Sequence, residues 1–299
     1  MTLRLATRGS PLALWQAHHI QHLLSPVVAC ELVLIETHGD RDQATALSAM
    51  GGFGVFTKAI QQALLDGRAD VAVHSLKDLP TLVTDGVELS AVPERGPTGD
   101  AFVSERYGAF EELPQGATVG TSSLRRRAML KHRRSDLNLV DLRGNVETRL
   151  RKLHDRQLDG IVLAEAGLVR LGLGGHIREV LPDAWLAPAV GQGAIGLEAR
   201  SDDDRTRRLL EGIIHAETWA RVTAERAMLS ALGGGCLVPI GAITCIAGET
   251  LHLQGFVLSL DGTRRIVASH SGPILTPLAV GQECAAKLTD EGAAEMLLR

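Results

Sequence analysis

A single cysteine, Cys236, lies in a run of residues that favours neither helix nor strand. It follows Gly233-Gly234-Gly235 and precedes Leu237-Val238-Pro239. Consecutive glycines cost roughly 0.5–1 kcal/mol each relative to alanine inside a regular element, so they are typical of places where the backbone bends or a ligand comes close. The pattern predicts a thiol presented on a loop, although a small buried side chain is the commoner fate of an unpaired cysteine. No histidine neighbours Cys236 in the sequence, which disfavours a Cys-His hydrolase.

Two predicted helix starts combine the groups that bind anions. Each follows a predicted strand, so unpaired backbone N–H groups and the positive end of a helix dipole meet polar side chains there. For the first of them taken alone, simple N-capping by Ser122 or Ser123 is the alternative interpretation. The first helix start holds Thr121, Ser122, Ser123, Arg125 and Arg126, and the second holds Arg143, Gly144, Asn145 and Arg149.

Basic residues are concentrated around these two helix starts. From 121 to 156 the chain has nine Arg and two Lys against four Asp and Glu, a local net charge of +7 in a protein whose total is −4. The planar guanidinium fork matches a carboxylate or phosphate two bonds at a time, so clustered arginine is typical of polyanion recognition. Codon usage would explain why arginine outnumbers lysine, but not why arginine is concentrated here.

A carboxylate and an ammonium group follow another predicted strand, residues 70–75. The stretch His74-Ser75-Leu76-Lys77-Asp78-Leu79-Pro80 ends in a proline, which keeps it from continuing as a helix. Such a pair of charges is more often solvated on the surface. At the carboxyl end of a strand facing an arginine-lined cleft, however, Asp78 is the kind of group that would stabilise a positively charged intermediate.

Segments of strand and helix character alternate through most of the chain, which is typical of an α/β fold with parallel strands. In such sheets ligands gather at the carboxyl ends of the strands, where Arg8 and residues 75–78 are expected to lie. Strands are expected at 3–6, 31–37, 70–75, 118–120, 137–142, 160–164 and 194–199, and helices from 11 onward and at 56–66, 123–134, 145–156 and, as two helices, 202–232. Three strand-like runs, 240–247, 251–260 and 264–270, precede a helix expected from Pro277 to the end.

Two irregular stretches, residues 94–99 and 188–193, are expected to cross between two lobes. We therefore predict an α/β protein with two lobes like those of periplasmic binding proteins, with a hinge and a cleft, plus a small α+β C-terminal domain. The predicted boundaries are 1–95 with 194–212 for the first lobe, 99–188 for the second, and 213–299 for the C-terminal domain, which carries the cysteine loop.

Composition excludes several classes of protein. With 299 residues, of which 45% are hydrophobic and 22% charged, the chain is long enough for two or three domains. No stretch approaches the roughly eighteen apolar residues of a membrane helix, and arginines stand where a signal peptide needs its apolar run, so we expect a cytoplasmic protein. The four cysteines lack Cys-x-x-Cys spacing, so we expect neither a disulfide scaffold nor a metal site.

Seven stretches together resemble the porphobilinogen deaminase family, also called hydroxymethylbilane synthase. The resemblance spans Leu3 to about Ala242. It is carried by residues 6–17 (ATRGSPLALWQA), 74–80 (HSLKDLP), 119–126 (VGTSSLRR), 142–145 (LRGN), 188–196 (PAVGQGAIG), 221–226 (RVTAER) and 234–241 (GGCLVPIG).

The resemblance implies an enzyme of porphyrin and haem biosynthesis that joins four porphobilinogen molecules head to tail, each losing ammonia, into the linear tetrapyrrole hydroxymethylbilane. It implies a dipyrromethane primer, one per chain, held by a thioether to Cys236, and Asp78 as the catalytic carboxylate. The implied cofactor-binding residues are Ser75, Lys77, Thr121, Ser122, Ser123, Arg125, Arg126, Arg143 and Gly144, and the implied substrate-binding residues are Arg8, Ser10, Arg149 and Arg170.

One stretch departs from the family pattern. The family usually has Gly-Gly-Lys-Gly-Leu-Phe-x-Lys-Glu, whereas this chain has GGFGVFTKA at residues 51–59, so Phe53 replaces the first lysine and Ala59 the glutamate. Glycines flank Phe53 and a polar run precedes it, so few side chains in this segment would hold it in place. This suits a lid that contains Phe53 and Lys58 and folds over an occupied cleft. The alternative is that Phe53 is an ordinary hydrophobic anchor.

A two-lobed anion-binding module without catalysis is the main rival function. It would need the arginines but neither Asp78 nor a presented thiol, so the presence of both favours the enzyme. A nucleic-acid binder is disfavoured because only nine aromatic residues are available to stack on bases. We therefore expect a monomer that binds porphobilinogen as its small-molecule substrate, and no nucleic acid, membrane or metal.

We expect the purified protein to be heavier than its sequence by one dipyrromethane, because a presented thiol lies in a chain whose arginines offer counterions for the carboxylates of that group. Intact-protein mass spectrometry checks the addition. Peptide mapping should place it on Cys236 and not on Cys30, Cys245 or Cys284. An unmodified mass in protein made by cells with normal tetrapyrrole synthesis would contradict this expectation.

Overall fold

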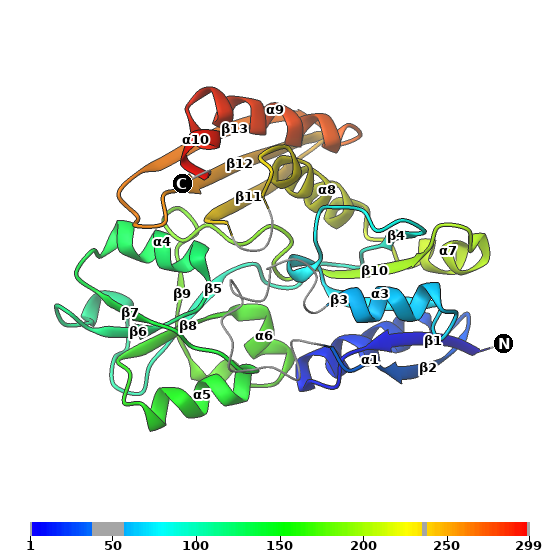
Figure 1. The fold of residues 1–299 in the computed structure, drawn as a ribbon, viewed down its shortest axis with the longest axis horizontal. Coiled ribbons are helices and arrows are strands. Elements are labelled where there is room, and N and C mark those ends of the chain that lie inside the picture. Colours follow the sequence, from blue (N-terminus) through cyan, green and yellow to red (C-terminus); the bar gives the residue numbers. More distant parts are fainter. Residues whose placement is uncertain (1, 38–56, 235–237, 298–299) are drawn as a thin grey trace. The chain divides into compact units, whose positions relative to one another are not determined.

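Two five-stranded sheets and a three-stranded sheet organise the described part of the chain (Figure 1). The computed structural model describes residues 2–37, 57–234 and 238–297. The chain divides into two compact units, residues 1–96 with 193–219 (unit 1) and residues 97–192 with 220–299 (unit 2). Unit 1 contains one five-stranded sheet, and unit 2 contains the other together with the three-stranded sheet.

Unit 1 is built on a mixed sheet of strand order β2-β1-β3-β10-β4. β1 runs parallel to β2 and β3, whereas β10, from much later in the chain, runs antiparallel to β3 and β4. The elements are β1 (Thr2–Thr7), α1 (Pro11–Leu24), β2 (Ala29–Leu34), α3 (Lys58–Leu65), β3 (Val71–Ser75), the 3-10 turn η1 (Leu76–Asp78), β4 (Val87–Ala91), β10 (Ile195–Arg200), α7 (Asp204–Glu211) and the first residues of α8 (Ala216–Ala231).

Helices cover both faces of this sheet because its strands bury side chains on both faces. Leu5 and Leu197 pack in one cluster with Ile20 of α1. Ala6, the next residue along β1, belongs to a second cluster with Ile60 of α3. Since successive side chains of a strand lie on opposite faces, α1 and α3 cover opposite sides of the sheet.

Unit 2 has a second mixed sheet, of strand order β7-β6-β8-β5-β9. β6 runs parallel to β7 and β8, and β5 runs antiparallel to β8 and β9. The elements are β5 (Asp100–Val103), η2 (Phe110–Glu112), β6 (Thr118–Gly120), α4 (Leu124–Arg133), β7 (Asn138–Val140), α5 (Val146–Asp155), β8 (Gly160–Ala164), α6 (Glu165–Arg170), η3 (Gly174–His176) and β9 (Ile177–Leu181).

The second sheet is also covered on both faces. Phe102 and Val162 pack with Met129 of α4. Their neighbours Val103 and Ile161 belong to a separate cluster on the side of α5 and α6. Figure 1 shows α4 and α5 on opposite sides of the strands. The helix starts that follow β6, β7 and β8 are thus held by two packed cores.

The C-terminal part of unit 2 is an antiparallel sheet with helices on one side. It consists of β11 (Ile240–Ala247), β12 (Thr250–Leu258), β13 (Arg265–Pro273), α9 (Pro277–Asp290) and α10 (Ala293–Leu297). Leu253 packs with Met228 of α8 and Cys284 of α9, whereas Phe256 shares the α4 core. At the β12–β13 turn, Gly262 has a φ of +77°, and a Cβ there would lie 2.6 Å from the Ala128 carbonyl oxygen of α4. Only glycine fits, so the hairpin tip packs directly on α4.

The predicted fold class is confirmed: two α/β lobes are accompanied by a small C-terminal domain with its own three-stranded sheet. The expected parallel pattern is confirmed for β1, β2 and β3 and for β6, β7 and β8, whereas β10 and β5 run antiparallel to their neighbours. The single helix expected from Pro277 to the end is also wrong, because Gly292, at a φ of +91°, separates α9 from α10. The hinge, the cleft and the three sets of domain boundaries stay predictions.

We expect Gly160→Ala to destabilise unit 2. An added Cβ would lie 2.3 Å from Cε2 of Phe102, which is fully buried, so the core would have to shift. Overpacking of this kind costs about 1–3 kcal/mol, which should lower the melting temperature by several degrees in a calorimetric scan. Gly175→Ala is the control, because no atom lies within 4 Å of its added Cβ. Equal melting temperatures for the two variants would contradict the prediction.

Candidate functional site

The loop after β1 and the end of β3 lie at one edge of the unit 1 sheet, because these two strands are parallel neighbours. Arg8 and Ser10 belong to this loop, and Ser75 ends β3. The Ser10 hydroxyl caps α1 by accepting a hydrogen bond from the Ala13 N–H at 3.4 Å. The buried Gln16 of α1 donates from Nε2 to Ser75 Oγ at 2.9 Å. Gln16, which the sequence did not single out, therefore joins α1 to the end of β3.

Lys77 and Asp78 lie on η1, directly after β3. Leu76 anchors this turn, because its side chain is buried and its N–H donates to the Ala194 carbonyl at 3.0 Å. The Leu79 N–H closes the turn on the Leu76 carbonyl at 3.1 Å. Both charged side chains are half-buried. A neighbouring ammonium and carboxylate are thus fixed by the backbone at the same edge as Arg8 and Ser10.

The first anion-binding helix start, at α4, uses its hydroxyls as acceptors. Ser123 caps α4 by accepting from the Arg126 N–H at 3.4 Å, so the capping role is confirmed. Thr121 Oγ1 accepts from the Ser123 N–H at 3.3 Å, and Ser122 Oγ accepts from the Leu142 N–H at 2.9 Å. Within the described part of the chain these three hydroxyls accept but do not donate. Their O–H groups are therefore available to an anion.

Arg125 and Arg126, in the first turn of α4, are buried and share one carboxylate. Asp100, the first residue of β5, is 0% exposed. Arg126 Nη2 lies 2.6 Å from Asp100 Oδ1, and Arg125 Nη2 lies 2.7 Å from Oδ2. The two guanidinium groups also donate to the carbonyls of Ala187 and Val162, respectively. This pairing was not predicted from the sequence, because Asp100 is distant in the chain and falls at the end of an irregular stretch.

The shared carboxylate is held ionised in spite of its burial. Burial by itself raises the pKa of Asp100. Arg125, Arg126 and a hydrogen bond from Gln192 have the larger opposite effect, so the pKa falls to about 2. Because this pKa is below the ordinary value of 3.8, the ionised form stabilises the fold above about pH 4, and that stabilisation is lost as the pH falls toward 2. Asp100 thus pairs with both guanidinium groups, and a second carboxylate, Asp183, also attracts Arg125.

The second helix start, at α5, depends on a glycine. Gly144 has a φ of +115°, and an added Cβ would lie 2.6 Å from Thr148 Cγ2. The Gly144 carbonyl accepts from Arg149 Nε at 2.8 Å, and the Arg143 carbonyl accepts from Lys152 Nζ at 2.9 Å. Nη1 of Arg143 is buried and has no hydrogen-bond partner among the described residues. The loop thus orders two predicted site residues and adds Lys152, which the sequence analysis did not assign.

Positive charge accumulates around this loop. Burial, followed by four neighbouring arginines, lowers the pKa of Lys152; the arginines are Arg156, Arg149, Arg151 and Arg143. At the end of α6, burial lowers the pKa of Arg170 to about 10. Both shifts are the cost of holding cations close to one another or away from water, which a bound anion would relieve.

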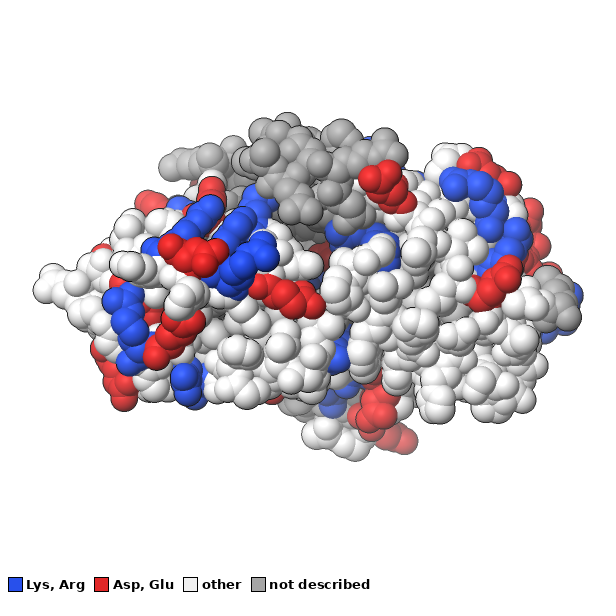
Figure 2. All heavy atoms as spheres, turned by 90° about the horizontal axis from the view of Figure 1, so that it is seen from below, with Lys and Arg blue, Asp and Glu red and all other residues white. Residues whose placement is uncertain are grey.

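Other arginines of the basic segment are neutralised by ion pairs. Arg127 lies 3.3 Å from Asp141, Arg133 lies 2.7 Å from Glu111, and Arg134 lies 2.8 Å from Asp136. Figure 2 likewise shows basic side chains interspersed with acidic ones on the face that it draws. The +7 of residues 121–156 is therefore not spread evenly, and its excess falls on the helix starts and α5.

Two predicted site residues, Cys236 and Phe53, lie outside the described residues. Lys58, the other predicted lid residue, is the first residue of α3 and is exposed. Burial raises the pKa of the Cys30 and Cys284 thiols, which lowers their thiolate fraction and their reactivity.

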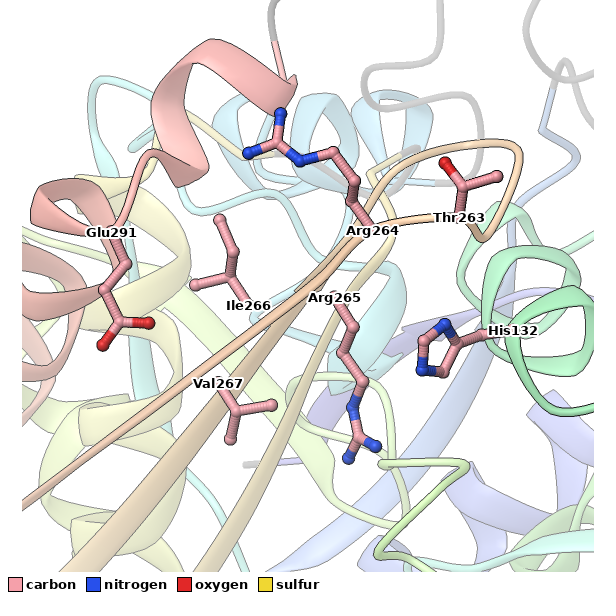
Figure 3. Close-up of a pocket in the computed structure, with 7 residues that line it drawn as sticks. All are labelled: His132, Thr263, Arg264, Arg265, Ile266, Val267 and Glu291. Atoms are coloured by element: carbon pink, nitrogen blue, oxygen red, sulfur yellow. The ribbon is translucent and has the colours of Figure 1, made fainter.

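A groove of about 770 Å³ in unit 2 lies apart from the predicted site residues (Figure 3). It is lined by His132, Thr263, Arg264, Arg265, Ile266, Val267 and Glu291. Arg265 is occupied, since it donates to the Ala184 carbonyl and stacks 5.1 Å from the centre of the Phe256 ring. Figure 3 shows the two arginines extending in different directions, so they do not converge on one ligand.

In residues 2–37, 57–234 and 238–297, no group of three or more His, Cys, Asp and Glu is arranged to hold a metal ion. None of the described helices is long and apolar enough to cross a membrane.

Two family models match the sequence. Residues 3–208 match the dipyrromethane cofactor-binding domain of porphobilinogen deaminase, and residues 219–290 match the C-terminal domain of porphobilinogen deaminase.

The chain is also similar, at low sequence identity, to several solved structures. A putative methionine-binding lipoprotein from Bacillus subtilis is 12% identical, with 72% of this chain and 90% of that chain covered and a TM-score of 0.45. A periplasmic substrate-binding protein of an ABC transporter from Coxiella burnetii is 13% identical, with 75% and 96% covered and a TM-score of 0.46. No function follows from similarities at this level.

We expect Arg126→Lys to lower stability more than Arg143→Lys. Lysine keeps the charge at residue 126 but loses the planar guanidinium group that donates both to Asp100 and to the Val162 carbonyl. Hydrogen bonds of charged groups contribute about 1.5–3 kcal/mol to stability. Arg143 is only half-buried, so its loss should be smaller. Urea unfolding measures both. A larger loss for Arg143→Lys would contradict the assignment of Arg126 to a buried ion pair.

Proposed function

The chain belongs to the porphobilinogen deaminase family, and from this premise we propose that it joins four porphobilinogen molecules head to tail, with loss of ammonia at each addition, into hydroxymethylbilane. The two family models together support an enzyme of tetrapyrrole biosynthesis that polymerises porphobilinogen. The structural observation that carries the proposal is the excess of cationic donors at the helix starts of unit 2. Every pyrrole unit brings two carboxylates, so the growing chain requires such donors.

The family's dipyrromethane cofactor fits the residues present in unit 2. It is a polyanion, and α4 offers two guanidinium groups that share a single carboxylate. Arg125 Nε and Arg143 Nη1 are buried without hydrogen-bond partners among the described residues, and an acid arm would satisfy them. When bound, the dipyrromethane supplies the primer to which the first substrate is joined.

We assign the cofactor to the residues that the family resemblance implies. Cys236 is proposed to hold it by a thioether, one per chain. The acid arms are assigned to Ser75, Lys77, Thr121, Ser122, Ser123, Arg125, Arg126, Arg143 and Gly144. The O–H groups of the α4 serines and threonine, which accept but do not donate among the described residues, support their place in this set.

Asp78 is proposed to stabilise the positive charge that develops when porphobilinogen loses ammonia. A half-buried carboxylate held by a short turn is preorganised, so little reorganisation is needed when charge appears next to it. The acetate and propionate arms of the substrate are assigned to Arg8, Ser10, Arg149 and Arg170. The half-buried Arg170 supports this assignment, because a nearby carboxylate would favour the charged form that burial disfavours.

The remaining proposals concern the lid, the assembly and the location. Residues around Phe53 and Lys58 are proposed to cover the occupied site, the enzyme to act as a monomer, and the cell compartment to be the cytoplasm. A two-lobed anion-binding module without catalysis is the alternative function, and it would have no need of Asp78.

We expect Asp78→Asn to keep its fold and its covalent cofactor but to lose most of its turnover. Losing one preorganised charged group typically costs about 3–4 kcal/mol in the chemical step, or roughly a hundred- to thousandfold in rate. Steady-state release of hydroxymethylbilane measures the loss, and the intact mass checks the cofactor.

Asp66→Asn is the matched control in the same unit. Its carboxylate lies on the surface, 3.4 Å from Arg68, and should leave turnover within about twofold of the unmodified enzyme. Near-normal turnover in Asp78→Asn would show that another group stabilises the cation.

A further inference from the structure

A buried glutamine completes the polar network around Asp100. Gln192 is 1% exposed. Its Nε2 group donates to Asp100 Oδ1 at 3.0 Å, to the Thr98 carbonyl at 2.7 Å and to the Gly99 carbonyl at 3.2 Å. One side-chain amide therefore joins the end of the stretch 188–192 to the stretch that leads into β5.

The backbone on both sides of this network is held in place. Asp100 pairs with Ala164 across the antiparallel strands β5 and β8, which fixes its Cα at the edge where α4 begins. Beside Gln192, the Gly191 N–H donates to Oε2 of the buried Glu225 at 2.8 Å. The carboxylate and the amide are therefore positioned by the fold before any ligand binds.

Asp100 and the nearby carbonyl groups accept hydrogen bonds from most of the guanidinium nitrogens of Arg125 and Arg126. Arg126 uses Nε and Nη2 on Asp100 and Nη1 on Val162. Arg125 places Nη2 on Asp100 and Nη1 on Ala187, which leaves its Nε without a partner among the described residues. Without the carboxylate, two adjacent buried cations would repel each other and lose these orientations.

We propose that Asp100 and Gln192 are positioning residues that hold Arg125 and Arg126 in the orientation in which their remaining donors receive the acid arms of the dipyrromethane. The inference rests on the proposed function. Neither residue is assigned a contact with the reacting atoms, so both act through the arginines.

The test compares two buried glutamines that each donate to a carboxylate. Gln192→Met removes the amide at similar volume, and Gln61→Met does the same in unit 1, where Gln61 donates to Glu198 at 3.0 and 3.1 Å. Both variants should melt earlier. Only Gln192→Met should reduce the fraction of purified protein that carries the dipyrromethane adduct, by several-fold in the intact mass spectrum. Equal adduct fractions in the two variants would overturn the proposal.

A double substitution separates positioning from general destabilisation. Because Gln192 and Arg126 share Asp100 Oδ1, Arg126→Lys combined with Gln192→Met should lower the adduct fraction no further than Arg126→Lys alone. Additive losses would overturn the proposal. Asp100→Asn should lose more adduct than Asp159→Asn, which removes the carboxylate that pairs with Arg106 at 2.8 Å. An unmodified protein without any adduct would instead count against the proposed function.

Discussion

The buried carboxylate of Asp100 is the interaction on which the arrangement of unit 2 depends. Two adjacent guanidinium groups could not share a desolvated place without a counterion, because their burial and mutual repulsion both oppose folding. The Asp100 carboxylate pairs with both guanidinium groups, and Asp183 adds a further attraction to Arg125. The proposed cofactor site is thus built on cations that are already balanced in part within the fold. Such cations suit a group that binds through several carboxylates at once.

Sheet topology explains how both units gather their polar residues. In each unit, parallel strands bring loops and helix starts to one edge: Arg8 and Ser75 in unit 1, and the starts of α4 and α5 in unit 2. Two packed cores, one on each face of the sheet, hold the strands, so the loops at this edge inherit fixed positions. The proposed site residues thus lie on short connections that a rigid frame holds in place.

Local chemistry made part of the site predictable from the sequence. Ser10 followed by proline marked the start of α1, and the hydroxyls before Arg125 marked the start of α4, since capping depends on near neighbours. Asp100, Gln192 and Gln16 were missed because their partners are distant in the chain and are brought near only by strand pairing. The burial of Arg125 and Arg126 was missed for the same reason, because basic side chains are expected to be exposed unless their counterion is known. Cys236 and Phe53 were chosen from local pattern and resemblance and lie outside the described residues.

The antiparallel strands, which the alternation of helix and strand did not predict, position proposed site residues in both units. β10 and β5 each follow a crossing stretch and each begin at the edge where the site residues lie. The Ala194 carbonyl, just before β10, accepts the N–H of Leu76 and so fixes the turn that carries Asp78. Asp100, the first residue of β5, fixes Arg125 and Arg126. In both units, then, a residue at the start of the strand that follows the crossing stretch bonds the turn or the helix that carries proposed site residues. A change in the backbone of either stretch would therefore act on the proposed site residues through the Leu76–Ala194 hydrogen bond or through the two ion pairs of Asp100.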